Sequence, residues 1–390
     1  MKNIVYITEN LDFFSDSGAK IKTLNTIECL SKKFHITILS LNSSKKINQV
    51  YRRKFKNIDF HYVVDKNIEN PIKKRLLELI YFYIKGIPYY FFQYKNSSFK
   101  KLVDKKIKNI NPEVIHINHL TMSQYLPKNK RQIWVYEEHN IEHKLRFQMA
   151  RFSKKIGYHW LIWLMEGILL SFKEKSIWKK FDYIFTISRD DQEYISKYID
   201  KKKIFLQNIF MPVKKTVRHK KNNKDILFIG DLEWLPNRNG IEWFIKKVLP
   251  NIPKATLHLV GNVDKEFKNK NQQKNIVFYG YQNNIDSFFI KSSIFIAPLL
   301  IGEGVRIKIL DAFSRKIPVV ATKNATKGLS VKNKKEILIA KNSKEFKNYI
   351  TNIWGNKINT KNILDKATHY LDNNHSKKEN KIYIENYPIK

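Results

Sequence analysis

Short apolar runs typical of buried strands alternate with amphipathic stretches near the N-terminus. KNIVYIT (2–8) and FHITILSL (34–41) are apolar and β-branched, and the helical period of IKTLNTIECLSKK (21–33) lies between them. A strand, a loop, a helix and a second strand in this order predict parallel strands joined by a crossover helix. The first part of the chain is therefore expected to be an α/β domain.

The same alternation continues through the first half of the chain. The strand-like EVIHIN (113–118) follows the helix-like FKKLVDKKIKNINP (99–112), and FDYIFTIS (181–188) ends in a polar turn. Ser188 and Asp191 have the spacing of a capping box at a helix start. We therefore expect the adjacent acids of this turn to cap a helix rather than to bind a metal ion.

A polar and strongly basic run, MPVKKTVRHKKNNK (211–224), separates this half from a second series of strands. The strand-like runs of that series alternate with helical patterns and are DILFIG, ATLHLVGN, NIVFYG, SIFIAP and IPVVAT. A chain of 390 residues exceeds what one hydrophobic core usually supports. We expect two Rossmann-like α/β domains, at 1–210 and 225–371, joined by a linker at 211–224. The final segment, 372–390, is expected either to dock on the first domain or to fray.

Basic residues dominate the composition. Lys and Arg number 73 against 35 Asp and Glu, which gives a formal net charge of +38. This excess favours polyanionic partners or an anionic membrane leaflet. A lysine-rich composition spread over solvated faces explains it equally well, so both explanations stay open.

The sequence favours a cytoplasmic location. Cys29 is the single cysteine, which excludes an intramolecular disulfide, and nothing before it resembles a signal peptide. The most apolar helical stretch, Tyr158–Phe172, is shorter than a bilayer crossing and contains Glu166. We expect no transmembrane segment.

The stretch most informative about chemistry is APLLIGEGVRIKILDAFSRKIPVVAT (297–322). A strand is followed by a loop with Gly302 and Gly304 and then by a helix, and ligands bind at such carboxyl ends of strands. Glycines let the backbone approach a diphosphate, and the helix N-terminus attracts anions together with Arg306 and Lys308. The loop is predicted to cradle a phosphate-bearing ligand.

Two carboxylates accompany this loop. Glu303 precedes the helix and Asp311 lies eight positions later, roughly 12 Å along the axis if the interval is largely helical. Carboxylates accept hydrogen bonds from the hydroxyl pairs of ribose and hexoses. A nucleotide-sugar diphosphate would span that distance. The alternative is that neither residue binds a ligand, with Glu303 exposed in a surface loop and Asp311 on the polar face of an amphipathic helix.

On these residues the C-terminal half resembles retaining glycosyltransferases of family 4. The family signature is an acidic residue, then seven other residues, then a second acidic residue in a helix, followed by a strand ending PVVAT. The likeness extends over three further stretches, ILFIGDLEWLPNRNGIEWFIKKVLP, LHLVGN and VFYGYQNNI. It implies the GT-B fold, two Rossmann-like domains facing across a cleft, with the donor bound mainly by the second. Glu303 would meet the transferred sugar, and Asp311, one methylene shorter than the usual Glu, would meet the ribose.

The N-terminal resemblance is weaker. Ser17, Gly18 and Lys22 stand where the family usually carries two glycines and a nearby Arg. The resemblance implies that Gly18 lets the first loop approach the donor phosphates, with Lys22 in the place of the Arg.

A second departure concerns the diphosphate site. After the strand end at Gly230 the family often places an Arg and then a Lys, whereas this chain has Asp231. Arg238, Arg306 and Lys308 are the available substitutes. We expect Arg306 and Lys308 to serve, because they lie in the glycine loop itself.

Histidines follow two strands of the first domain. The family tends to carry a functional His near HINH (116–119), so His119 or His116 is expected near the reacting sugar, although Asn118 occupies the place that fits best. His139, after the next strand, is expected to contact the acceptor or a phosphate.

These observations favour an enzyme, a glycosyltransferase and more narrowly a hexosyltransferase, acting with retention in surface polysaccharide or lipopolysaccharide biosynthesis. The expected donor is a UDP- or GDP-sugar, and the expected acceptor is a glycan or a lipid-linked glycan. KKRLLELIYFYIKGIPYYFFQY (73–94) would give peripheral contact with an anionic inner membrane, although core packing explains its aromatics equally well. We expect no cofactor, no nucleic acid and no metal ion, since the His-rich stretch 137–143 lacks the HExxH order.

Three alternatives remain at this stage. A nucleotide-sugar epimerase of the same architecture would need no acceptor, so its products would differ. A NAD-dependent oxidoreductase would need a Gly-x-Gly-x-x-Gly turn, and the first loop has only Gly18. A non-enzymatic nucleotide- or nucleic-acid-binding protein fits the charge, but the sequence lacks a zinc finger, an aromatic RNA-binding motif and a clustered basic tail.

Overall fold

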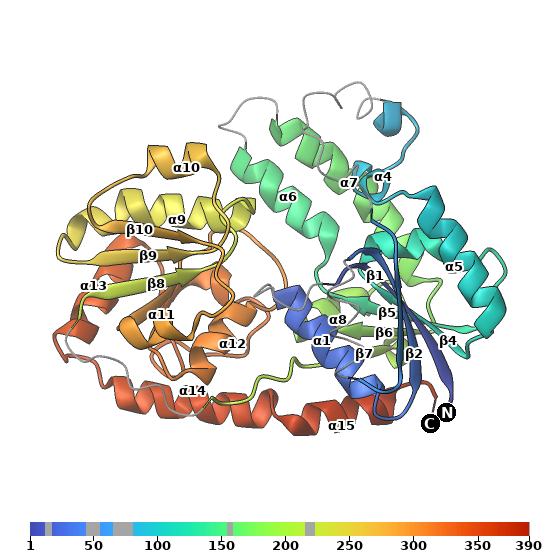
Figure 1. Cartoon of the computed structure of the whole chain (residues 1–390). Helices are drawn as coiled ribbons and strands as arrows, with labels where there is room; N and C mark the ends of the chain where they lie inside the picture. The colour runs from blue at the N-terminus through green and yellow to red at the C-terminus, as the bar shows by residue number, and fades with distance from the viewer. Residues whose placement is uncertain (12–17, 44–54, 65–80, 154–158, 215–222, 390) are drawn as a thin grey trace. The chain divides into compact units, whose positions relative to one another are not determined.

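The computed structural model describes residues 1–389 except 12–17, 44–54, 65–80, 154–158 and 215–222. Contacts divide the chain into two compact units (Figure 1). The first unit comprises Met1–Phe14, Ala19–Gln207 and Asn380–Lys390, and the second comprises Ser15–Gly18 and Asn208–Glu379. The chain thus leaves the first unit after residue 207 and returns to it at residue 380.

A seven-stranded parallel sheet of order β3-β2-β1-β4-β5-β6-β7 forms the centre of the first unit. Side chains of β1 alternate between its two faces, with Val5 and Ile7 in one apolar cluster and Ile4 and Tyr6 in the other. The strands are β1 (Asn3–Asn10), β2 (His35–Asn42), β3 (Ile58–Tyr62), β4 (Val114–Asn118), β5 (Ile133–Glu138), β6 (Tyr183–Thr186) and β7 (Ile204–Leu206).

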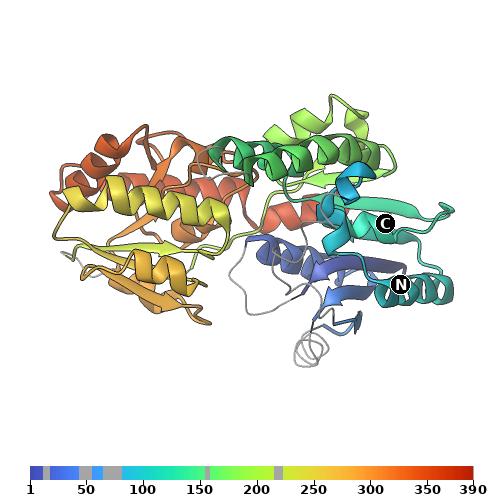
Figure 2. The same cartoon turned by 90° about the horizontal axis from the view of Figure 1, so that it is seen from above.

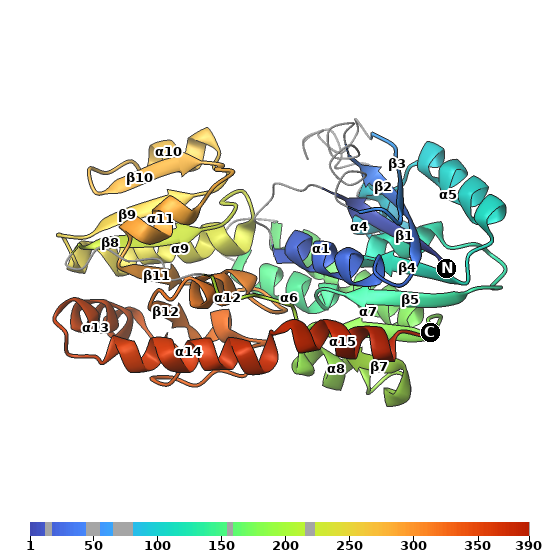
Figure 3. The same ribbon diagram turned by 60° about the horizontal axis from the view of Figure 1, so that its bottom comes forward.

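Helices cover both faces of this sheet. α5 (Ser97–Ile110) and α7 (His159–Trp178) contribute Val103 and Trp178 to the cluster on one face. α1 (Gly18–Leu30) and α15 (Lys377–Asn386) lie on the other face, where Ile27 and Tyr383 are buried (Figure 3). Other helices of the described part include α4 (Tyr89–Gln93), α6 (Glu142–Ser153) and α8 (Arg189–Ile195), with the short 3-10 turns η2 (Leu120–Tyr125) and η3 (Lys201–Lys203).

The second unit is built on a six-stranded parallel sheet of order β10-β9-β8-β11-β12-β13, again with helices on both faces (Figure 2). Its strands are β8 (Asp225–Ile229), β9 (Thr256–Val260), β10 (Ile276–Gly280), β11 (Ile294–Ala297), β12 (Val319–Thr322) and β13 (Leu338–Ala340). Its helices are α9 (Leu235–Lys247), α10 (Lys265–Lys270), α11 (Asp286–Lys291), α12 (Ile307–Ser314), α13 (Ser343–Trp354) and α14 (Thr360–Asn374), with the 3-10 turns η4 (Leu249–Asn251) and η5 (Lys323–Thr326).

Both sheets are doubly wound, which places a ligand site by topology. The strand order reverses between β1 and β4 in the first unit and between β8 and β11 in the second. In sheets of this kind ligands bind outside the carboxyl ends of the strands at that reversal. The predicted α/β fold of two Rossmann-like domains is confirmed.

The structure tests some of the other sequence predictions, and some fall on residues outside its described part. Ser188 is the N-cap of α8 and its hydroxyl accepts from the Asp191 N–H at 3.0 Å, so the capping prediction is confirmed. Of the predicted linker, residues 215–222 lie outside the described part, as do residues 73–80 of the predicted membrane segment. Among the described helices, none is both long and apolar enough to cross a bilayer.

Candidate functional site

The glycine loop of the second unit joins β11 to α12 at the carboxyl end of the sheet. Gly302 and Gly304 have φ of +128° and +74°, a region that favours glycine. A Cβ on Gly302 would collide with the guanidinium of Arg306, so this glycine also makes room for that cation. The helix begins only at Ile307, with Arg306 as its N-cap residue. The separation of roughly 12 Å was predicted for a largely helical interval, and the interval from Glu303 to Asp311 is helical only from Ile307.

Lys308 carries the second cation of the loop. Its half-buried Nζ donates to Asn237 Oδ1 at 2.9 Å and lies 4.2 Å from the centre of the Phe228 ring. A Cβ on Gly230 would approach Nζ to 2.5 Å, so glycine at this strand end makes room for it. Burial and then the nearby charge of Arg306 lower the pKa of Lys308 to about 7.

The two predicted carboxylates lie in different surroundings. Glu303 forms an ion pair with Lys327 at 3.1 Å, and its backbone carbonyl accepts from Arg306 Nη1 at 2.5 Å. Asp311 lies on α12, where its Oδ1 accepts from Nε of Arg315 at 3.1 Å. Glu303 is therefore part of the cationic loop, whereas Asp311 is held along the helix. Sequence reasoning missed Lys327, for which no local signal exists.

Two predicted cations are engaged elsewhere. Arg238 pairs with Asp264 and stacks over the ring of Phe267, which makes it a poor substitute for the family's diphosphate ligands. Lys22 is 1% exposed and forms an ion pair with Glu137. A buried and paired ammonium cannot reach a donor phosphate, so the structure corrects the prediction for Lys22. Gly18 begins α1, and the preceding loop residues 12–17 lie outside the described part.

Glu137 is the centre of a buried polar network at the ends of β4 and β5. Its carboxylate accepts from Thr26 Oγ1 at 2.7 Å, from the Tyr6 hydroxyl at 2.9 Å and from Asn118 Nδ2 at 2.8 Å. Burial acts to raise the pKa of Glu137, but the charge of Lys22 together with the contributions of His116 and His139 holds the pKa well below its usual range. Glu137 is therefore an ionised carboxylate inside the core.

His119 and His139 face each other beside this network. Their rings stack with centroids 4.3 Å apart and planes 18° apart. His119 has φ of +76°, a backbone region that costs a non-glycine residue about 1–3 kcal/mol and that clusters at functional sites. Burial and then the charge of His119 lower the pKa of His139 well below its usual value, so this ring is neutral near pH 7. His116 is fully buried and does not join the stacked pair.

A second polar group at the same edge was missed by sequence reasoning. Arg146, 7% exposed, lies over the rings of Tyr90 at 4.8 Å and Trp163 at 5.5 Å, and pairs with Glu142 at 3.4 Å. Burial raises the pKa of Glu142 to about 7. The sequence held one signal for this group, because Glu166 interrupts an apolar helix and here accepts from the backbone N–H of Tyr90 at 2.7 Å.

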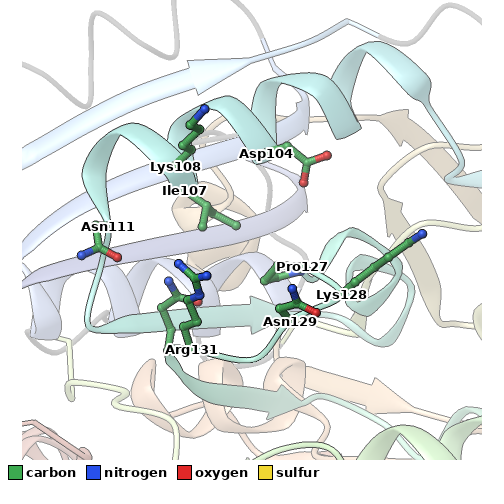
Figure 4. Close-up of a pocket in the computed structure, with 9 residues that line it drawn as sticks. Asp104, Ile107, Lys108, Asn111, Pro127, Lys128, Asn129 and Arg131 are labelled. Carbon is green, nitrogen blue, oxygen red and sulfur yellow. The ribbon is translucent and has the colours of Figure 1, made fainter.

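A surface cavity of about 370 Å³ lies elsewhere in the first unit, between the end of α5 and the chain before β5 (Figure 4). Its lining residues are Asp104, Ile107, Lys108, Asn111, Pro127, Lys128, Asn129, Arg131 and Gln132. They belong to the amino ends of the strands, opposite to the edge where ligands bind, and include no predicted site residue. Among the described residues, no group of three or more His, Cys, Asp or Glu is placed to hold a metal ion.

Comparisons with known proteins place this geometry in context. Residues 223–356 match the family described as glycosyl transferases group 1. An uncharacterized 44.6 kDa protein in the cps region of Klebsiella pneumoniae is 22% identical over 97% of this chain and 98% of its own length.

Solved structures resemble the fold over the whole chain. Sucrose-phosphate synthase from Thermosynechococcus elongatus superposes with a TM-score of 0.73 at 13% identity, covering 99% of this chain and 98% of that one. The Anabaena protein Alr3699/HepE, in complex with UDP-glucose, superposes with a TM-score of 0.67 at 12% identity, covering 99% of each chain. The family match covers residues 223–356, and the likeness to these solved structures shows that the chain shares their fold.

Proposed function

We propose that this protein transfers a hexosyl group, with retention, from a UDP- or GDP-sugar to a glycan or lipid-linked acceptor in surface polysaccharide or lipopolysaccharide biosynthesis. The observation that carries the proposal is the pair of cations, Arg306 and Lys308, held by glycines at the carboxyl edge of the second sheet. Sugar transfer from a nucleotide requires stabilisation of a departing diphosphate, which preorganised cations provide. Retention rests on the resemblance to family 4, and the cps-region relative supports a surface glycan.

The loop residues divide the donor between them. Arg306 and Lys308 bind the diphosphate, and glycines 302, 304 and 230 give it room to approach. Glu303 binds hydroxyl groups of the transferred sugar, with Lys327 holding its carboxylate in place. Asp311 binds the ribose, and this requires a turn of its carboxylate away from Arg315. Gly18 gives the first loop its close approach to the donor.

In the first unit, His119 and His139 contact the reacting sugar or the acceptor hydroxyl. The lowered pKa of His139 and the strained backbone of His119 support this assignment. Such costs in free energy are typical of functional sites and are not needed to pack a core. Lys22 has no place in it and supports Glu137 instead.

The acceptor sugar binds the group formed by Glu142, Arg146 and Tyr90. Aromatic faces and carboxylates together suit a hydroxyl-rich pyranose ring better than a phosphate, which the neighbouring Glu9 and Glu166 would repel. The acceptor end recognised by the protein is therefore a sugar rather than a lipid phosphate.

The first unit docks on an anionic membrane leaflet through an apolar and basic surface beside α7. Ile84 is 78% exposed and Phe172 72%, and the hydroxyl of Tyr83 joins the two segments by donating to the Ile162 carbonyl at 3.4 Å. Lys173 follows Phe172 on α7, and its ammonium lies 5.6 Å from the centre of the Phe91 ring. Apolar insertion with basic anchors is the chemistry of peripheral binding to anionic lipid.

The decisive experiment is a thermal-shift screen against UDP, GDP, ADP, CMP and NAD, followed by product analysis. A ligand that binds only the native state raises the apparent stability, so a response to UDP or GDP supports the proposed donor. A response to NAD alone favours an oxidoreductase instead. Conversion of the donor without sugar transfer to any acceptor favours an epimerase.

A further inference from the structure

Two tyrosines near the C-terminus, Tyr383 in α15 and Tyr387 directly after it, lie in the core of the first unit. Tyr383 and Tyr387 are each 2% exposed and belong to the apolar cluster on the α1 side of the sheet. Their hydroxyl groups differ. The Tyr387 hydroxyl lies 3.0 Å from Nδ1 of His116, whereas the Tyr383 hydroxyl has no hydrogen-bond partner within the described residues. Tyr387 therefore joins the polar network of β4 and β5, and Tyr383 serves as its natural comparison.

The ionised Glu137 sets the direction of the hydrogen bonds around it. A carboxylate only accepts, so the amide of Asn118 turns its Nδ2 towards Glu137 Oε2, at 2.8 Å. The same Nδ2 lies 3.0 Å from Nε2 of His139. Nε2 of His139 is thus an acceptor, and the single proton of this neutral ring sits on Nδ1.

His116 lies on the opposite side of the same carboxylate. Its Nε2 is 3.6 Å from Glu137 Oε2, and among the described residues this buried nitrogen has no closer hydrogen-bond partner. Burial lowers the pKa of His116, so its ring is neutral and carries one proton. With the proton on Nε2 the ring directs an N–H at the carboxylate, and Nδ1 accepts from the Tyr387 hydroxyl. The other tautomer would direct a lone pair at the carboxylate, which is electrostatically unfavourable.

We propose that Tyr387 is a positioning residue of the candidate site. Its hydroxyl fixes the ring proton of His116 on Nε2, and His116 in turn steadies the Glu137 carboxylate. Glu137 and Asn118 then hold the His139 ring in one tautomer and one orientation. The proposal rests on the proposed function only where it gives His139 a place beside the reacting sugar.

A matched pair of variants tests this network. Tyr387→Phe and Tyr383→Phe each remove one buried hydroxyl and leave the ring that packs in the core. Nitrogen NMR of histidine-labelled protein reads the tautomer of each imidazole directly. We expect wild type and Tyr383→Phe to show His116 protonated on Nε2 and His139 on Nδ1. In Tyr387→Phe we expect a mixture of tautomers at His116 and displaced nitrogen resonances of His139.

Kinetics give a second readout that a merely structural role would not move. Loss of one oriented hydrogen bond should lower kcat about five- to tenfold in Tyr387→Phe, with the KM for the donor unchanged, because the donor binds the second unit. Tyr383→Phe should keep the wild-type kcat. A fall in kcat shared by both variants would reflect packing and would overturn the proposal.

The wild-type spectrum alone also decides the matter, even if Tyr387→Phe fails to fold. The proposal is overturned if His116 of the wild-type protein is protonated on Nδ1. It is also overturned if the His139 resonances are the same in Tyr387→Phe and Tyr383→Phe. Failure of the proposed function has a different signature. If His139→Ala transfers sugar as fast as wild type while the tautomers respond as expected, the network stands and the role given to His139 falls.

Discussion

The ammonium group of Lys308 lies 4.2 Å from the centre of the Phe228 ring, so a cation sits against an aromatic face at the carboxyl end of β8. The ring favours the charge, but burial and the neighbouring Arg306 oppose it and lower the pKa of Lys308 to about 7. Near pH 7 Lys308 is therefore only partly protonated, and a bound diphosphate would favour its charged form.

Donor affinity should fall as the pH rises through 7. Below that pH Lys308 is already protonated, whereas above it binding of the diphosphate must take up a proton. We expect the affinity for UDP, measured by titration calorimetry between pH 6 and 9, to fall by up to about tenfold per pH unit above 7. Lys308→Arg keeps its charge and should flatten this dependence. Parallel profiles for the two proteins would contradict the assignment.

Glu303→Gln should abolish most transfer and leave nucleotide binding intact. The variant keeps the shape of the side chain but weakens its acceptance of sugar hydroxyls and its pairing with Lys327. We expect a loss of about 100-fold or more in transfer, measured as product from a UDP- or GDP-sugar, with an unchanged thermal shift by UDP or GDP. Glu266→Gln, on the exposed face of α10, is the matched control. Wild-type activity of Glu303→Gln would remove this residue from the catalytic account.

Breaking the buried pair of Lys22 and Glu137 should destabilise the first unit. Lys22→Met leaves an unpaired carboxylate in the core, which costs about 3–5 kcal/mol. Urea unfolding should show this loss, and the double variant Lys22→Met/Glu137→Leu should regain most of it because it removes both charges. A double variant no more stable than Lys22→Met would show that the pairing is not the cause.

Glu142 should make stability depend on pH. Burial raises its pKa to about 7, opposed by Arg146 and assisted by the facing carboxylates Glu174, Glu9 and Glu166. Between about pH 4.5 and 7 the folded chain keeps a proton that the unfolded chain releases, so the contribution of this group is lost as the pH rises. Glu142→Gln should match wild type near pH 5 and exceed its free energy of unfolding by up to about 3 kcal/mol at pH 8.

The comparison for Glu142 is the exposed Glu193 of α8. Glu193→Gln should follow the wild-type stability at every pH, because this side chain is exposed rather than packed in the core. Should Glu142→Gln show the same flat difference from wild type, the carboxylate is not held protonated by its surroundings.

The exposed surface beside α7 should bind anionic lipid. We expect wild-type protein to sediment with phosphatidylglycerol vesicles at low salt, to be released by high salt, and to ignore phosphatidylcholine vesicles. The variant Ile84→Ser/Phe172→Ser should bind several-fold more weakly, since two exposed apolar anchors are removed. Val64→Ser, at another exposed apolar position of the first unit, is the control. Equal sedimentation of all three proteins would assign the binding to net charge alone.

The sequence predicted what depends on local pattern. Strands β4 and β5, the capping of α8 by Ser188 and the glycine loop before α12 all follow from residue types a few positions apart. The glycines were the clearest signal for the loop, because a single glycine can indicate a backbone position with positive φ. The sequence also placed Glu303 before the helix, and α12 begins at Ile307.

The remaining site features depend on partners that are distant in sequence. Lys22 was taken for a phosphate ligand because its position matched, yet its carboxylate partner lies 115 residues away. Tyr387 and His116 are 271 residues apart. No periodicity or spacing connects such residues, because only the order of strands in the sheet brings them together.

The return of the chain to the first unit has a consequence for how the protein is made. Tyr383, Tyr387 and Ile389 complete the apolar cluster on one face of the first sheet. While the ribosome is synthesising the second unit, that face is still exposed, although every strand of the sheet has already emerged. The unit that is translated first therefore completes its folding last. Interrupted synthesis would release a first unit with exposed apolar residues on one face of its sheet, and such a surface favours aggregation.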